Sequence, residues 1–109
     1  MEPVQRTEVA IILSTTPRGG GEKISRILVE EHLAACVNLM ETRSFFLWKG
    51  NLEREEEDLL IIKTVSERLP ETIRRIREIH PYEIPEMIVL PVVAGNEPYL
   101  QWVRKEILG

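Results

Sequence analysis

The sequence predicts an α+β fold, a ferredoxin-like βαββαβ sandwich with an additional C-terminal helix. Apolar, β-branched stretches alternate with amphipathic stretches in the order strand, helix, strand, strand, helix, strand, helix. The two central strands are joined by a short turn that contains a glycine, which makes them an antiparallel hairpin between two βαβ-like units. We therefore expect a single domain over residues 1–109, with an antiparallel sheet and helices on one of its faces.

The first predicted strand covers residues 8–15, because residues 9–13 are continuously apolar and mostly β-branched. Pro17 and the glycines at 19–21 interrupt this pattern. The glycines precede a helix, but their spacing matches neither G-x-x-x-x-G-K-[ST] nor G-x-G-x-x-G. We therefore interpret residues 19–21 as a flexible turn and not as a phosphate cradle.

Three helices are predicted from apolar residues that recur every three or four positions. The first runs from Glu22 to Ala35. Ser66 is the expected N-cap of the second, whose buried face contains Leu69, Ile73, Ile76 and Ile79. The third begins near Pro98 and buries Leu100, Val103 and Ile107. Between the last two helices, residues 87–93 form a fourth strand, and Pro91 predicts that this strand bulges or lies at a sheet edge.

The central hairpin is long for a domain of this size. Its strands are predicted at residues 36–48 and 52–64, each about twice the usual strand length. A three-residue turn at 49–51 would place Trp48 opposite Leu52 and Arg43 opposite Glu57. Such a hairpin overhangs the rest of the domain and leaves unpaired edges, which are ready to pair with another chain. From this length we expect self-association.

Composition and charge exclude several classes of function. The formal net charge is -4, which argues against non-specific binding to nucleic acid or to anionic membranes. No apolar run approaches the roughly 20 residues of a membrane helix, and no apolar leader is visible, so we expect a cytoplasmic protein. The single cysteine, Cys36, excludes an internal disulfide and every zinc motif that needs two cysteines.

Lys63 and the acidic run at residues 53–58 are the charged features of the second hairpin strand. Because alternate strand residues point to opposite faces, the acidic run does not converge on a cation, and we interpret it as a solvated arm. Lys63 closes an apolar strand, so it is either a lysine at the sheet rim or a cation that lines a cleft for an anionic group. Glu57 shares its face but lies about 20 Å away along the strand. Only another subunit could bring two such groups together.

The connector at residues 80–86 carries a histidine, a tyrosine and two glutamates, together with two prolines that stiffen its backbone. His80 ends a helix, where it is either a C-terminal cap or a metal ligand. A lone histidine lacks the further ligands that a metal site requires. Ser14 has no neighbouring His and Asp, and no other nucleophile or acid–base pair is evident, so we do not expect an enzyme.

Several segments, in order along the chain, together resemble the CutA (divalent-cation tolerance) family. They are Leu33-Ala34-Ala35-Cys36-Val37-Asn38, Ser44-Phe45-Phe46-Leu47-Trp48-Lys49-Gly50, Glu57, Lys63-Thr64, His80-Pro81-Tyr82-Glu83-Ile84-Pro85-Glu86 and Tyr99-Leu100-Gln101-Trp102. The resemblance implies a homotrimer like that of the nitrogen-regulatory PII proteins, with the long hairpins forming an intersubunit sheet. It also implies a non-enzymatic role in tolerance of, and response to, divalent metal ions, copper especially.

The resemblance also implies site residues. Trp48, Glu57, Lys63 and Tyr82 match positions around the family's intersubunit cleft. Of the copper ligands proposed for some members only His80 is present, since Ser14 and Ile79 stand where those members carry cysteine and histidine. In the S-x-Y-x-W-x-G motif, Phe46 replaces the tyrosine. A divalent metal, Cu or Zn, would thus bind weakly, through His80 and neighbouring carboxylates, and no organic cofactor is expected.

Two alternatives remain open. One is a PII-like sensor that binds a small anionic ligand in the intersubunit cleft, over Lys63, Tyr82 and Trp48. The other is a structural trimer that presents a partner-binding surface, for which the long hairpin is the support.

Overall fold

The computed structural model describes residues 7–109 and has the predicted element order. Its elements are β1 (Val9–Pro17), α1 (Gly21–Glu30), β2 (Cys36–Trp48), β3 (Asn51–Val65), a 3₁₀ turn (Ser66–Arg68), α2 (Leu69–Ile79), β4 (Ile88–Pro91) and α3 (Glu97–Leu108). The four strands form one antiparallel sheet in the order β2-β3-β1-β4. The predicted α+β fold is therefore confirmed, and Pro91 lies on an edge strand, as predicted.

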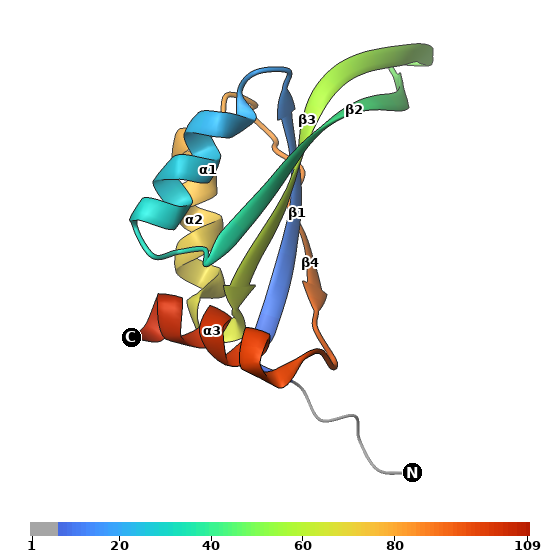
Figure 1. Ribbon diagram of the computed structural model, residues 1–109. Helices are drawn as coiled ribbons and strands as arrows, with labels where there is room; N and C mark the ends of the chain where they lie inside the picture. Colours follow the sequence, from blue (N-terminus) through green and yellow to red (C-terminus); the bar gives the residue numbers. More distant parts are fainter. Residues whose placement is uncertain (1–6) are drawn as a thin grey trace.

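The main core lies between the sheet and the helices α1 and α2, which cover the same face (Figure 1). Ile12, Leu60 and Ile62 point from β1 and β3 into this core, where they pack against α1 and α2 residues that include Leu28 and Ile76. These side chains are fully buried, and each contributes about 1.5–3 kcal/mol relative to an exposed position. This core holds the polar residues at the ends of β1 and β3 in place.

α3 packs against the opposite face of the sheet, at one end. Val9 and Val65 are register partners, and both are buried with Leu100, Val103 and Ile107 of α3. Because side chains alternate along a strand, Val9 and Val65 point away from the α1 and α2 side. The rest of this face, which we call the open face, is apolar and only partly covered, and its residues are Ile11, Leu13, Met40, Leu59, Ile61, Ile88 and Leu90.

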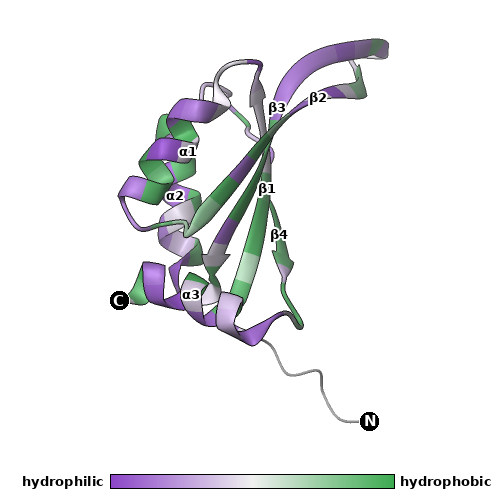
Figure 2. Cartoon of the chain, in the orientation of Figure 1, coloured by the Kyte–Doolittle hydropathy of each residue, from purple (hydrophilic) through white to green (hydrophobic). Residues whose placement is uncertain are grey.

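The hairpin extends well beyond the rest of the sheet (Figure 1). β1 ends opposite Glu57, so beyond it β2 and β3 have only each other as sheet partners among the described residues. We call this extension, residues 42–57, the arm. Figure 2 shows hydrophilic residues along much of the arm and hydrophobic residues where the strands cross the core. At its tip, however, Leu47, Trp48 and Leu52 are 71%, 60% and 72% exposed.

The hairpin turn is one residue shorter than predicted. Lys49 and Gly50 both have positive φ, 51° and 82°, which is the backbone of a two-residue type I′ turn. Trp48 therefore pairs with Asn51, and Arg43 pairs with Glu56 and not with Glu57. The predicted pairs were wrong because the turn has two residues and not three. A two-residue type I′ turn matches the twist of the flanking strands.

Two helix boundaries also differ from the prediction. α1 ends at Glu30, because His32 has a φ of 60° and the amides of Leu33 and Ala34 turn back to the carbonyl of Leu28. Ser66 lies in the 3₁₀ turn and makes no side-chain cap, so α2 begins at Leu69. No helix within residues 7–109 is long and apolar enough to cross a membrane.

Candidate functional site

His80 sits at the end of α2 with both ring nitrogens engaged. Its Nε2 lies 2.8 Å from the carbonyl oxygen of Thr15, and its Nδ1 lies 3.0 Å from the backbone nitrogen of Tyr82. The carbonyl accepts and the amide N–H donates, so these partners select the tautomer with its hydrogen on Nε2. The side chain is 8% exposed. His80 thus ties the start of the connector to the end of β1.

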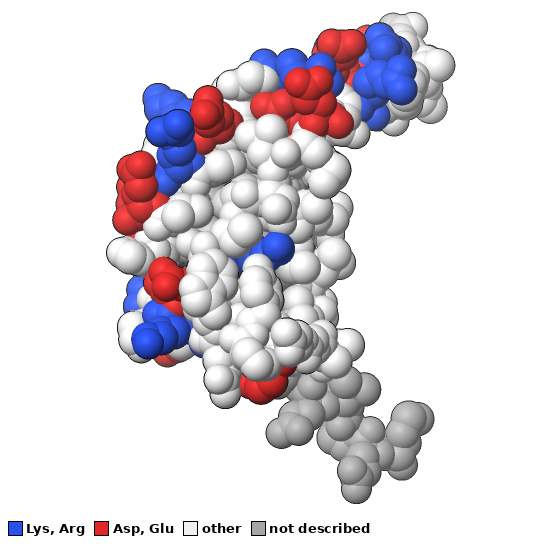
Figure 3. Space-filling view, in the orientation of Figure 1, with Lys and Arg blue, Asp and Glu red and all other residues white. Residues whose placement is uncertain are grey.

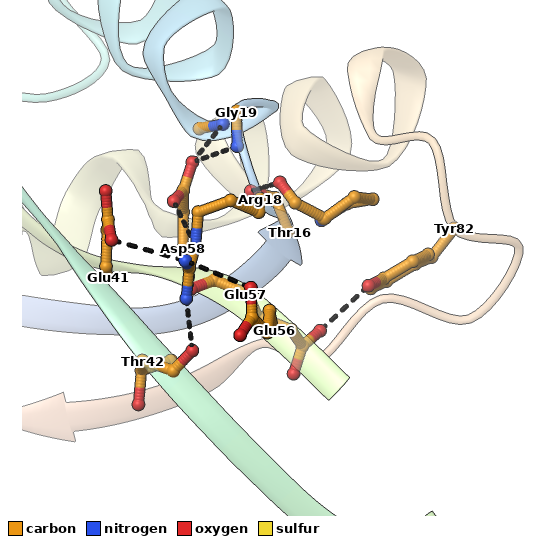
Figure 4. A network of polar contacts seen from close by, with 11 residues as sticks. Thr16, Arg18, Gly19, Glu41, Thr42, Glu56, Glu57, Asp58 and Tyr82 are labelled. Carbon is orange, nitrogen blue, oxygen red and sulfur yellow. Dashed lines mark hydrogen bonds and ion pairs between the residues drawn. The ribbon is translucent and has the colours of Figure 1, made fainter. Parts of the chain in front are cut away.

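Tyr82 connects His80 to the base of the arm. Its hydroxyl donates a 2.8 Å hydrogen bond to Oε2 of Glu57, as Figure 4 shows. Glu57 is only 6% exposed, and within residues 7–109 no Lys, Arg or His lies within ion-pair distance of its carboxylate. Burial, together with the hydrogen bond to the Glu57 carboxylate, raises the pKa of Tyr82 to about 12.

A second polar network holds the start of α1 against the hairpin. Oδ2 of Asp58 accepts hydrogen bonds from the amides of Gly19, at 3.0 Å, and Gly21, at 3.1 Å. Arg18 lies beside Asp58, with Nε 3.6 Å from Oδ1 (Figure 4). A hollow of about 600 Å³ is lined by Arg18 and Asp58 of this network and by α1 residues that include Glu22 and Arg26. Because Asp58 already supplies an anion to these amides, the loop at residues 19–21 does not offer them to a phosphate.

The sequence did not predict this network, and it predicted the Asp58 carboxylate to be solvated. Residues 53–58 were interpreted as a solvated run, yet Glu57 and Asp58 are buried, at 6% and 3% exposure. The interpretation was wrong for these two residues because β1 and the α1 N-terminus pack against this part of β3. The available signal was the end of the acidic run, where it meets the buried strand sequence Leu59-Leu60-Ile61-Ile62.

Lys63 lies on the open face, away from the Tyr82 and Glu57 pair. Its Nζ is 5.6 Å from the centre of the Tyr99 ring and 4.0 Å from Sγ of Cys36. Within residues 7–109 it makes no salt bridge. Tyr99 also stacks at a tilt on Trp102, with 5.6 Å between ring centres. The ammonium therefore lies over one aromatic ring, that of Tyr99, and not beside a carboxylate.

The four residues assigned to a cleft do not meet within one chain. Glu57 and Tyr82 are in contact, and His80 is stacked beside Tyr82 with 5.1 Å between ring centres. Lys63 follows Glu57 by six residues on the same strand, about 20 Å away. Trp48 lies at the tip of the arm, with the Lys49 ammonium 5.9 Å from its ring centre. A cleft that includes all four needs a surface from another chain.

The metal-binding capacity of the described residues is small. Within residues 7–109, no group of three or more His, Cys, Asp and Glu side chains is arranged to hold a metal ion. The lone pair of His80 Nδ1 already accepts the Tyr82 amide, so a metal would have to displace that hydrogen bond. Ser14 is fully buried and Ile79 has no donor atom. These residues do not fit a tight copper or zinc centre.

Charged side chains avoid the middle of the molecule in the view of Figure 3. They gather along the arm and over the helical side, whereas the surface between them is nearly free of charge. The apolar residues of the open face make it the surface of this chain that is best suited to burial.

Comparison with known proteins places these features in a family. The family model described as CutA1 divalent ion tolerance protein matches residues 9–106. The human protein named Protein CutA is 49% identical over 85 residues, which cover 77% of this chain and 48% of that protein. The chain thus spans about half the length of the curated mammalian relatives that it matches.

Solved structures agree with the fold. CutA from Xylella fastidiosa is 40% identical, with a TM-score of 0.89, and the match covers 92% of this chain and 98% of that one. A structure titled PII-like protein CutA, from Nostoc, is also 40% identical, with a TM-score of 0.86 over 90% of this chain and 96% of that one.

Proposed function

Because this chain belongs to the CutA1 divalent ion tolerance family, we propose that it acts in the response to divalent metal ions, copper among them, as a cytosolic, non-enzymatic homotrimer. The observation that carries the proposal is the family match over residues 9–106, which includes every site residue described above. Two features of the chain make the proposal more specific: its exposed apolar surfaces and the hydrogen bonds that occupy both ring nitrogens of His80.

The homotrimer is supported by surface that one chain leaves uncovered. The open face carries exposed Met40, Ile88 and Leu90, and the arm tip adds Trp48 and Leu47. Both are exposed apolar surfaces of the kind that protein–protein interfaces bury. Within residues 7–109, no strand pairs with the two outer edges of the arm, and such edges favour pairing with other copies. Light scattering of the purified protein tests the proposal, and a monomer would contradict it.

Metal contact is proposed to be weak and to involve His80 with neighbouring carboxylates. Its weakness follows from the geometry, since a metal must compete with the Tyr82 amide for Nδ1. The buried Glu57 carboxylate is within the same network, joined to His80 through Tyr82. The protein would therefore respond to metal without storing it tightly.

Calorimetric titration with Cu²⁺ and with Zn²⁺ tests this role. We expect weak binding that His80→Ala reduces. The matched control is His32→Ala, because His32 is the other histidine and is exposed, 3.2 Å from the Glu106 carbonyl. If His80→Ala binds metal as the wild type does, His80 is not in the site.

The absence of enzymatic activity is proposed from the state of the nucleophiles. Ser14 Oγ is buried and has no hydrogen-bond partner among the described residues, so no base is placed to activate it. Cys36 lies near a lysine and not near a histidine. Neither side chain is set up for covalent catalysis.

Lys63 favours a second candidate, a sensor for a small anionic ligand. Its ammonium is not neutralised by a carboxylate within residues 7–109 and lies against an aromatic ring, on the face that another copy would enclose. A thermal-shift screen of anionic metabolites with wild type and Lys63→Met tests it. Lys49→Met is the matched control, since Lys49 also lies over an aromatic ring but on the arm tip. A screen without any stabilising anion would contradict this candidate.

A further inference from the structure

The arm needs an anchor at its base. Beyond the pair Thr42 and Glu57, β2 and β3 pair only with each other within residues 7–109, because β1 ends at Pro17, opposite Glu57. A two-stranded ribbon is at best marginally stable by itself in water. The direction in which the arm leaves the core therefore depends on the residues that contact its base, at Thr42 and Glu57.

Arg18, the residue after β1, makes that contact. Its Nη2 donates to the carbonyl of Thr42 at 2.7 Å, and its Nε donates to the carbonyl of Glu57 at 3.3 Å. Thr42 and Glu57 are register partners on β2 and β3, so one guanidinium joins both strands at the level where the third strand is lost (Figure 4). Its Nη1 also lies 3.2 Å from Glu41 and 3.5 Å from Glu56, so carboxylates from both strands surround it.

Asp58 links Arg18 to the turn at residues 18–21. Asp58 accepts the Gly19 and Gly21 amides on either side of the turn, and its other oxygen faces Nε of Arg18. A Cβ at Gly21 would lie 2.9 Å from side-chain carbons of both Leu39 and Leu60, so the turn is packed directly on β2 and β3. The turn at residues 18–21 thus joins β1, α1 and both hairpin strands at one point.

We propose that Arg18 is the positioning residue of the arm. The planar guanidinium acts as a clamp that replaces the missing third strand and fixes the angle between arm and core within a single chain. A second copy would then meet an arm that is already ordered, so less conformational entropy is lost on association. The clamp itself does not depend on the assembly.

Hydrogen–deuterium exchange of the full-length protein, resolved by peptide, tests the clamp. We expect Arg18→Met to raise exchange in residues 42–57 by about tenfold, as for the loss of hydrogen bonds to a charged donor, with residues 9–16 and 59–64 unchanged. Arg18→Lys keeps the charge, but a single ammonium lacks the fork that spans two carbonyls, so it should also raise exchange in the arm. Arg26→Met is the control, because Arg26 lines the same hollow and, in the part of the chain that the structure describes, pairs only with Glu22.

Two results would overturn the proposal. One is arm exchange in Arg18→Met equal to that of the wild type. The other is equal acceleration in arm and core, which would make Arg18 a general stabilising residue. If Arg18→Met does not fold, Arg18→Lys decides by the same comparison. Light scattering of the same samples reports assembly separately, so a wild type that is not a trimer contradicts the proposed function and leaves the exchange result to decide the role of Arg18.

Discussion

The hydroxyl of Tyr82 donates a 2.8 Å hydrogen bond to the buried carboxylate of Glu57 and so ties the connector after α2 to the base of the arm. The two residues are 25 positions apart in sequence. Among residues 7–109, the buried Glu57 side chain has this one hydrogen-bond donor and no cation within ion-pair distance. An arrangement of this kind is sensitive to the loss of either partner.

Tyr82→Phe is expected to destabilise the protein by about 1–3 kcal/mol. The change removes the hydroxyl and leaves a buried carboxylate without its donor, which costs more than the hydrogen bond itself. Urea unfolding measures the difference. Tyr99→Phe is the control, because Tyr99 is 40% exposed and its ring, which faces Lys63, is retained. Equal stability of both variants would show that the hydrogen bond contributes nothing.

Alkaline pH should weaken the folded state through the same pair. The pKa of Tyr82 is raised from about 10 to about 12, so the neutral phenol is favoured in the folded protein. Its contribution to stability is fully present below pH 10 and is lost as the pH rises through 12. We expect the melting temperature of wild type to fall across this interval more steeply than that of Tyr82→Phe. Ultraviolet titration should find one of the two tyrosines ionising near pH 12, and ionisation of both near 10 would contradict the prediction.

Ser14→Ala should be neutral or stabilising. The Ser14 hydroxyl is fully buried, and the described residues give it no hydrogen-bond partner, so its removal relieves a desolvation cost. Thr64→Val is the contrasting variant. Thr64 is equally buried, but its hydroxyl donates to the Leu33 carbonyl at 2.8 Å, and its loss should cost about 1 kcal/mol. Thermal unfolding of the two variants measures the contrast, and a larger loss for Ser14→Ala would contradict it.

Acid should weaken the link between α1 and α2. Arg75 binds the Glu31 carboxylate with two hydrogen bonds of 2.9 Å, which lowers the pKa of Glu31 from its ordinary value of 4.5. The stability that this pair contributes is present above pH 4.5 and is lost as the pH falls through the lowered pKa. Glu31→Gln should therefore show a shallower decline in melting temperature below pH 4.5 than wild type. Glu22→Gln, in the exposed pair with Arg26, should follow the wild type.

Much of the fold could be predicted from local patterns. Strand β2 was predicted with its observed bounds, and the buried face of α3 with its three residues, because strand and helix periodicities are local properties. The hairpin register was shifted by one residue, since it depends on the backbone of Lys49 and Gly50 and not on the flanking pattern. The end of α1 was placed too late because the positive φ of His32 has no marker in its residue type.

The candidate site could be predicted only residue by residue. His80, Tyr82 and Glu57 were identified by family resemblance, but their chain of hydrogen bonds joins β1, the connector and β3. Arg18 and Asp58 were missed, because their roles arise where the end of β1 meets both strands of the hairpin.

By itself, the sequence determined the order of the elements, the long hairpin and the family of this protein. Hydrophobic periodicity and turn residues act over a few positions, so they can be interpreted without knowledge of the rest of the chain. Only the tertiary structure decided which charged groups are buried and what faces them. The environment of Glu57 and Asp58 is made by segments distant in sequence, and burial raises the cost of an unpartnered charge. The same acidic run is therefore solvated along the arm and, at its base, buried at the centre of the polar network that holds the arm to the core.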